Sequence, residues 1–79
     1  MEQDRRLQFI NLPPTCEIRI YTLAGDLVNT LRHADPNRGY EDWNLTSHVG
    51  QAVASGIYLF TCEDLTNGKV QVGKFVIIK

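Results

Sequence analysis

The sequence predicts an all-β protein: an antiparallel β-sandwich or a small β-barrel of six or seven short strands. Apolar and polar side chains alternate along several segments, as in strands with one buried face, while helical periodicity is poor throughout. β-Branched residues are enriched in the same segments. Glycine, asparagine, aspartate and proline interrupt these segments about every 8–12 residues, a spacing typical of sandwiches and barrels.

The size and charge of the chain narrow its function classes. A chain of 79 residues buries only about 60–65% of its unfolded surface, so we expect one domain, residues 1–79, without a large internal pocket. The formal net charge of −1 lacks the basic excess of a nucleic-acid groove, so no nucleic-acid partner is expected. No segment approaches the ~20 apolar residues of a membrane span, so no membrane insertion is expected.

The clearest strand lies in the segment CEIRIYTL, in which every second residue is apolar. Its buried face is expected to hold Cys16, Ile18 and Ile20, and its solvent face Glu17, Arg19 and Tyr21. Before it, Phe9, Ile10 and Leu12 are expected to form a short first strand or an extended lead-in. The Pro13-Pro14 pair ends that strand, because proline has no backbone N–H to donate.

The segment LVNTLRH is expected to return as the partner of this strand. Gly25 precedes it and suits the left-handed position of a three-residue hairpin loop. Val28 and Leu31 are three residues apart, so strict alternation fails within the return strand. A β-bulge is one explanation of that failure.

A short strand is expected at Trp43 and Leu45, between two loops. Residues 34–42 are rich in turn formers, and residues 46–56 pivot on glycines. Trp43 is the largest apolar side chain available to the core.

Two longer strands close the sequence. In the segment IYLFTCE, Tyr58, Phe60 and Cys62 share one face. The Asn67-Gly68 pair is a strong turn signal, and the last strand is expected to cover about residues 69–78.

The two cysteines, Cys16 and Cys62, are both expected on core-facing positions. Neither belongs to a C-x-x-C pair, and the two histidines are not spaced as zinc ligands, so no metal site is expected. Two buried free thiols that behave as small hydrophobes are favoured, because register alone cannot place the two sulfurs within bonding reach. A disulfide between them stays open, because such bonds join facing strands in immunoglobulin-type sandwiches.

The remaining polar residues give no catalytic constellation. His33 and His48 each lie near a loop, with no nucleophile or carboxylate placed by sequence to partner them, so both are expected at the surface. The acidic pairs at residues 41–42 and 63–64 lack a calcium-loop pattern and are expected to be solvated. We therefore expect no catalytic residues, no cofactor and no enzymatic activity.

Three stretches of the chain follow recognisable patterns. Residues 18–28 are similar to the hairpin pattern I-Y-D-x-x-G-x-x-V, residues 50–58 to the pattern G-x-x-V-x-[SA]-G-x-Y, and residues 73–79 to the closing-strand pattern K-x-[ILV]-[ILV]-[ILV]-K. With these stretches in this order, the chain resembles the type IX secretion C-terminal sorting domain family, which is related to the immunoglobulin-like domain of the flagellar hook-capping protein. The motif residues carried by the first two stretches are Tyr21, Gly25, Gly56 and Tyr58.

This resemblance implies an immunoglobulin-like sandwich of about seven strands at the C-terminal end of a larger exported protein. It implies a sorting role: the module directs its cargo through the periplasm and an outer-membrane translocon to the surface of a Gram-negative bacterium. The implied partners are the translocon and a sortase-like enzyme. The closing strand is expected to carry the recognition signal, with the residues Gly73, Lys74, Phe75, Val76, Ile77, Ile78 and Lys79.

Two other functions stay open: a structural spacer or interaction module next to another domain, and a carbohydrate-binding module. In the second, Trp43, Tyr40 or Tyr58 would stack on sugar, although Trp43 and Tyr58 look like core residues.

The closing strand carries an expectation that a structure can test. Phe75 and Ile77 should face the core, while Val76 and Ile78 should be more exposed. An exposed apolar strand invites docking by another chain, self-association included.

Overall fold

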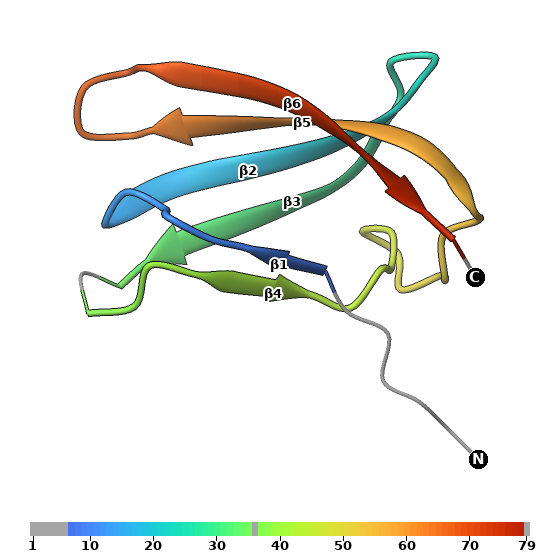
Figure 1. The fold of residues 1–79 in the computed structure, drawn as a ribbon, viewed down its shortest axis with the longest axis horizontal. Coiled ribbons are helices and arrows are strands. Elements are labelled where there is room, and N and C mark those ends of the chain that lie inside the picture. The colour runs from blue at the N-terminus through green and yellow to red at the C-terminus, as the bar shows by residue number, and fades with distance from the viewer. Residues whose placement is uncertain (1–6, 36, 79) are drawn as a thin grey trace.

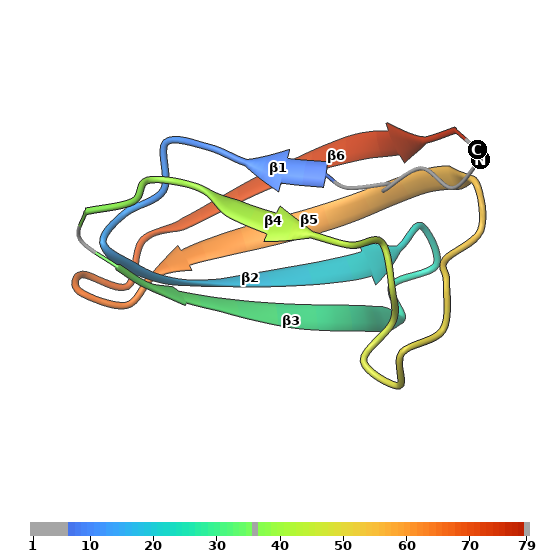
Figure 2. The same cartoon turned by 90° about the horizontal axis from the view of Figure 1, so that it is seen from below.

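The computed structural model describes residues 7–35 and 37–78, which form six strands in two antiparallel sheets (Figure 1). The strands are β1 (Leu7–Phe9), β2 (Thr15–Thr22), β3 (Leu27–Ala34), β4 (Glu41–Trp43), β5 (Gly56–Asp64) and β6 (Val70–Ile77). The larger sheet has the order β3-β2-β5-β6, and the smaller sheet pairs β1 with β4. The smaller sheet covers one face of the larger one (Figure 2), so the predicted antiparallel sandwich is confirmed, with six strands among the described residues.

The β2–β3 hairpin forms as the sequence predicts. Gly25 has a φ of 96°, in the left-handed region that favours glycine. The pairing shifts between Ile20, which faces Asn29, and Tyr21, which faces Leu27. Val28 is therefore the extra residue of a bulge, and its side chain is buried. This bulge explains the broken alternation in the return strand.

Two short strands end earlier than predicted. β1 ends at Phe9, and Ile10 lies outside it with 62% of its surface exposed. Asn11, with a φ of 57°, then turns the chain out of the extended conformation. β4 likewise ends at Trp43, because Leu45 has a φ of 63°, although the Leu45 side chain is still buried.

The core lies between the two sheets and is centred on aromatic rings. Trp43 is 1% exposed, as its size predicts. The Phe75 ring packs at centroid distances of 6.0–6.2 Å from four other rings, those of Phe9, Trp43, Tyr58 and Phe60. Phe75 thereby ties β6 to both strands of the smaller sheet.

Candidate recognition surface

β6 is an edge strand that carries its apolar side chains on both faces. Ile77 is 5% exposed and Phe75 is partly buried, whereas Val76 is 57% exposed and Ile78 84% exposed. This confirms the expected difference between the two faces. Lys79 lies outside the described residues. The outward row also extends toward the start of the strand, where Val70 and Val72 are exposed.

The neighbouring strand widens this apolar surface. Ile57 faces Val76 across the β5–β6 pair, and Leu59 faces Lys74. We call the outward apolar side chains of these two strands, together with Ile78 just after β6, the outer patch. It consists of Ile57, Leu59, Val70, Val72, Val76 and Ile78. Ile57 and Val76 are direct cross-strand neighbours, so these apolar residues are not scattered singly.

The charges on the rest of this sheet face neutralise one another. Arg19 lies 2.6 Å from Glu17 and 3.6 Å from Glu63, and Arg32 lies 3.5 Å from Glu17. Lys74 stands within the outer patch, and no carboxylate of the described residues forms an ion pair with it. The outer patch is thus apolar with one uncompensated positive charge.

An apolar groove of about 310 Å³ lies on the other side of β6. Its lining comes from β1 and the segment that follows it, and from the inner face of β5 and β6. The apolar members of this lining include Leu7, Phe9, Ile10, Leu12, Phe60 and Phe75. The groove therefore opens where the two sheets part, between the edges of β1 and β6.

Gly73 leaves room for a ring that lines this groove. It faces Phe60 in the β5–β6 pair, and a Cβ atom at Gly73 would lie 2.6 Å from two carbons of the Phe60 ring. Such an approach is too close for real Cβ atoms, so the ring occupies the space that any other residue would need. Gly73 of the predicted recognition strand is in this way a packing residue of the groove.

The family-motif residues have structural positions. Gly25 forms the hairpin turn, and Gly56 opens β5. Tyr21 is half-buried on β2. Tyr58 is buried, stacks on Phe75 and donates a hydrogen bond of 2.7 Å from its hydroxyl group to the Ala54 carbonyl. Gly56 and Tyr58 lie directly opposite β6, whereas Tyr21 and Gly25 belong to the β2–β3 hairpin, with β5 between β2 and β6.

The two cysteines are buried free thiols in this structure, the arrangement that the sequence favours over a disulfide. They lie on neighbouring strands of one sheet rather than on facing sheets. Cys62 faces Ile18, and Cys16 faces Asp64, so the two thiols are diagonal neighbours. Burial, together with the nearby Cys62 thiol, raises the pKa of Cys16 to about 12. A thiol with such a pKa is a weak nucleophile.

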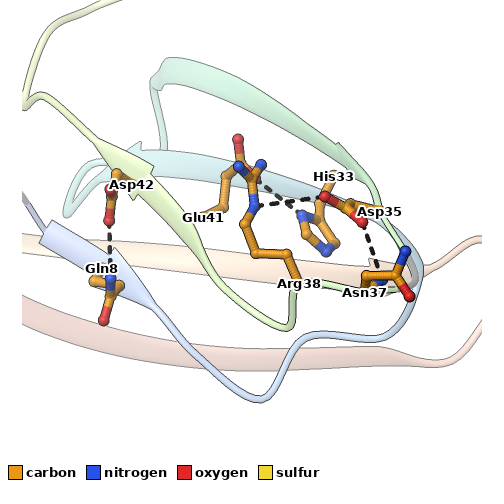
Figure 3. A network of polar contacts seen from close by, with 7 residues as sticks. All are labelled: Gln8, His33, Asp35, Asn37, Arg38, Glu41 and Asp42. Carbon is orange, nitrogen blue, oxygen red and sulfur yellow. Dashed lines mark hydrogen bonds and ion pairs between the residues drawn. The ribbon is translucent and has the colours of Figure 1, made fainter.

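The surface position expected for His33 is wrong. His33 is 1% exposed, because its inward register places it opposite Cys16. Its Nδ1–H donates to Glu41 Oε1 at 2.9 Å, and Arg38 Nη2 donates to the same oxygen at 2.8 Å (Figure 3). Glu41 is therefore tied into a network rather than simply solvated. His48 is exposed, as predicted.

This network joins the end of β3 to β4 and to the loop between them. His33 Nε2 is buried without a hydrogen-bond partner in the described structure. On the outer side of β4, Gln8 Nε2 donates to Asp42 Oδ1 at 3.1 Å and links β4 to β1 (Figure 3). The contacts hold the smaller sheet in place.

Within residues 7–35 and 37–78, no group of three or more histidine, cysteine, aspartate or glutamate side chains is arranged to hold a metal ion. That part of the chain also contains no helix long and apolar enough to cross a membrane.

Sequence reasoning identified β6 but missed the groove. The sequence predicts a short strand or lead-in at Phe9, Ile10 and Leu12, but nothing in it indicates that these residues line a groove beside β6. The inward register of His33 was readable once the bulge at Val28 was placed, because it sets the alternation of the rest of β3.

One solved structure, that of a type IX secretion component, contains a region with the same fold as this chain. No family model and no curated protein matches the chain. A domain of PorZ from Porphyromonas gingivalis superimposes with a TM-score of 0.74 at 24% sequence identity, over 91% of this chain. PorZ is described as an essential bacterial surface component of the type IX secretion system. The chain spans about 9% of the length of PorZ, so the likeness concerns one small part of that protein.

Proposed function

We propose that this chain is a non-catalytic sorting module that directs a larger cargo protein through the type IX secretion system. The observation that carries the proposal is the closing strand, whose outward apolar row lies at a sheet edge with which no other described strand pairs. The shared fold with a domain of PorZ supports the same system. The partners proposed are the translocon and a sortase-like enzyme, and the proposed location is the cell surface.

The exposure of the outer patch supports recognition by another protein. Apolar surface costs about 25 cal/mol for each Å² left in water. Two-stranded apolar patches on an edge also invite aggregation, and proteins usually place several charges there. The outer patch carries a single charge, that of Lys74, which suits a surface that becomes covered during function.

The two alternatives fit less well. A spacer in a row of domains needs the chain to enter and leave at opposite ends, whereas β1 begins and β6 ends toward the same end of this sandwich (Figure 1). A sugar-binding site needs exposed aromatic faces, whereas Trp43 and Tyr58 are buried. Tyr40 is exposed, with the Arg38 guanidinium 5.3 Å from its ring centre.

A reporter fusion tests the proposal. Residues 1–79 are fused to the C-terminal end of a reporter in a bacterium that has a type IX secretion system, and surface and medium fractions are assayed. We expect export of the intact fusion. A double variant, Val76→Asp with Ile78→Asp, should lower export at least about tenfold while circular dichroism shows an unchanged fold.

The matched control is Val49→Asp, since Val49 is 67% exposed in the loop between β4 and β5. Its export should equal that of the unchanged fusion. Absence of export from the unchanged fusion, or equal export of the control and the double variant, would contradict the sorting role.

A further inference from the structure

β6 has one paired edge and one free edge. It pairs with β5, and no other strand of the described structure pairs with it. β1, across the groove, is also an edge strand. The backbone N–H and C=O groups along a free edge are a template for a further strand.

We propose that β6 accepts an extended segment of another protein as an added strand. This segment has apolar side chains on both faces and a carboxylate beside Lys74. The inference rests on the proposed sorting role only for the source of the segment, which would be a component of the secretion machinery.

The two faces of β6 determine the chemistry of the segment. Alternate side chains of an added strand point to opposite faces of the sheet. One row would extend the outer patch beside Val72 and Val76. The other row would lie over the groove, against Ile10, Leu12 and Phe75. Both rows are therefore apolar, and main-chain hydrogen bonds to β6 supply the remaining affinity.

The charge of β6 determines the polar residue of the segment. Lys74 points outward among apolar neighbours, without an ion-pair partner in the described structure. A cross-strand carboxylate next to it would form an opposite-charge pair, which stabilises strand pairing. Specificity then comes from one acidic residue within an otherwise apolar segment.

A second copy of this chain is a poorer occupant. β6 carries Lys74 and has no carboxylate between Val70 and Ile77. Two β6 strands paired antiparallel would bring like charges together without a counter-charge, which destabilises the pairing. Electrostatic complementarity therefore favours a different protein over self-association.

Peptide binding to the isotope-labelled chain, followed by nuclear magnetic resonance, tests the proposal. The probe is a synthetic peptide of about nine valine, isoleucine and threonine residues with one central glutamate and a soluble tail. Its matched control has lysine in place of glutamate. We expect amide shifts concentrated in β6 and at least threefold tighter binding of the glutamate peptide. Lys74→Glu should reverse this preference, and higher salt should reduce it.

A variant pair checks the groove. Ile10 is 62% exposed and lines the groove, so Ile10→Ser should weaken binding without loss of the fold. Val49→Ser, equally exposed on a distant loop, should leave binding unchanged.

Three results would overturn the proposal: equal affinity for the two peptides, amide shifts at the β3 edge, or sedimentation that shows self-association blocking the peptide site. These outcomes are separate from the export assay. Export without peptide selectivity would remove the added-strand mode and leave the sorting role standing.

Discussion

The two edges of the larger sheet differ in how they are protected. β3 contains the bulge at Val28, and the loop between β4 and β5 docks against it. The His48 backbone N–H donates to the Val28 carbonyl at 2.9 Å, and the Asn29 side-chain amide donates to the Thr46 carbonyl at 2.8 Å. β6 pairs with β5 over eight consecutive residues without a register shift, and its outward row is mostly valine.

This difference separates a closed edge from an open one. The docked loop uses the Val28 carbonyl, and the bulge interrupts the regular edge at that point, so the start of β3 is less open to another chain. β6 has no bulge, and no loop of the described residues uses the backbone groups along its outer edge. β6 is therefore the more accessible of the two edges.

The largest expected effect follows from removing the Phe75 ring, which packs β6 against the smaller sheet. Phe75→Ala should lower the free energy of unfolding by about 2–4 kcal/mol, because Phe75 contacts rings from both sheets. Leu31→Ala on β3 removes a partly buried side chain and should cost about 1–2 kcal/mol. Urea unfolding measures both. If Leu31→Ala lowered the free energy of unfolding more than Phe75→Ala, the ring cluster around Phe75 would not be the main support of β6.

Gly73→Ala makes a smaller change to the packing of β6 against Phe60 of β5. The added methyl group would lie 2.6 Å from the Phe60 ring, so the ring must move. We expect a loss of about 1–3 kcal/mol in the free energy of unfolding. Gly25→Ala at the β2–β3 turn has open space but a φ of 96°, so its cost should come from backbone strain. A crystal structure of the Gly73 variant with an unmoved Phe60 ring would refute the packing argument.

The two thiols lie toward different edges of the larger sheet, so their labelling rates compare how accessible the two sides are. Cys62 lines the groove beside β6, whereas Cys16 faces His33 of β3 and is fully buried. We expect a maleimide reagent at pH 8 to label Cys62 at least about tenfold faster than Cys16. Mass spectrometry of Cys16→Ser and Cys62→Ser separates the rates. Faster labelling of Cys16 would show that the β3 edge opens first.

The raised pKa of Cys16 adds a pH dependence. The folded-state pKa of about 12 exceeds the ordinary value of 9.0, so folding favours the neutral thiol. Its contribution to stability is complete below pH 9 and is lost as the pH rises toward 12. The free energy of unfolding should therefore fall over this window, and the fall should be smaller in Cys16→Ser. Equal slopes in both proteins would contradict the assignment.

The smallest expected effect concerns the loop that closes β3. Asn29→Ala removes the hydrogen bond to the Thr46 carbonyl and should cost about 1 kcal/mol in the free energy of unfolding. Amide hydrogen exchange should rise in the loop at residues 46–52 and stay unchanged in β6. Faster exchange at both edges would show that the edges are not independent.

Alternation of apolar and polar residues in the sequence predicted the long strands, because successive side chains of a strand point to opposite faces and only one face is buried. The inward residues of β2 and β5, the turn at Gly25, the bulge and the exposure of Val76 and Ile78 all follow from period-two patterning and backbone sterics. The ends of β1 and β4 did not follow, because Asn11 and Leu45 adopt positive φ values that side-chain pattern does not reveal.

The sequence by itself determined the sandwich class and the apolar outward row of β6. These are properties of one strand and its period. Only the tertiary structure decided that His33 is buried, that Cys16 and Cys62 share a sheet, and that a groove separates β1 from β6. Each of these depends on which strands become neighbours, and that is set by contacts between residues far apart in the chain.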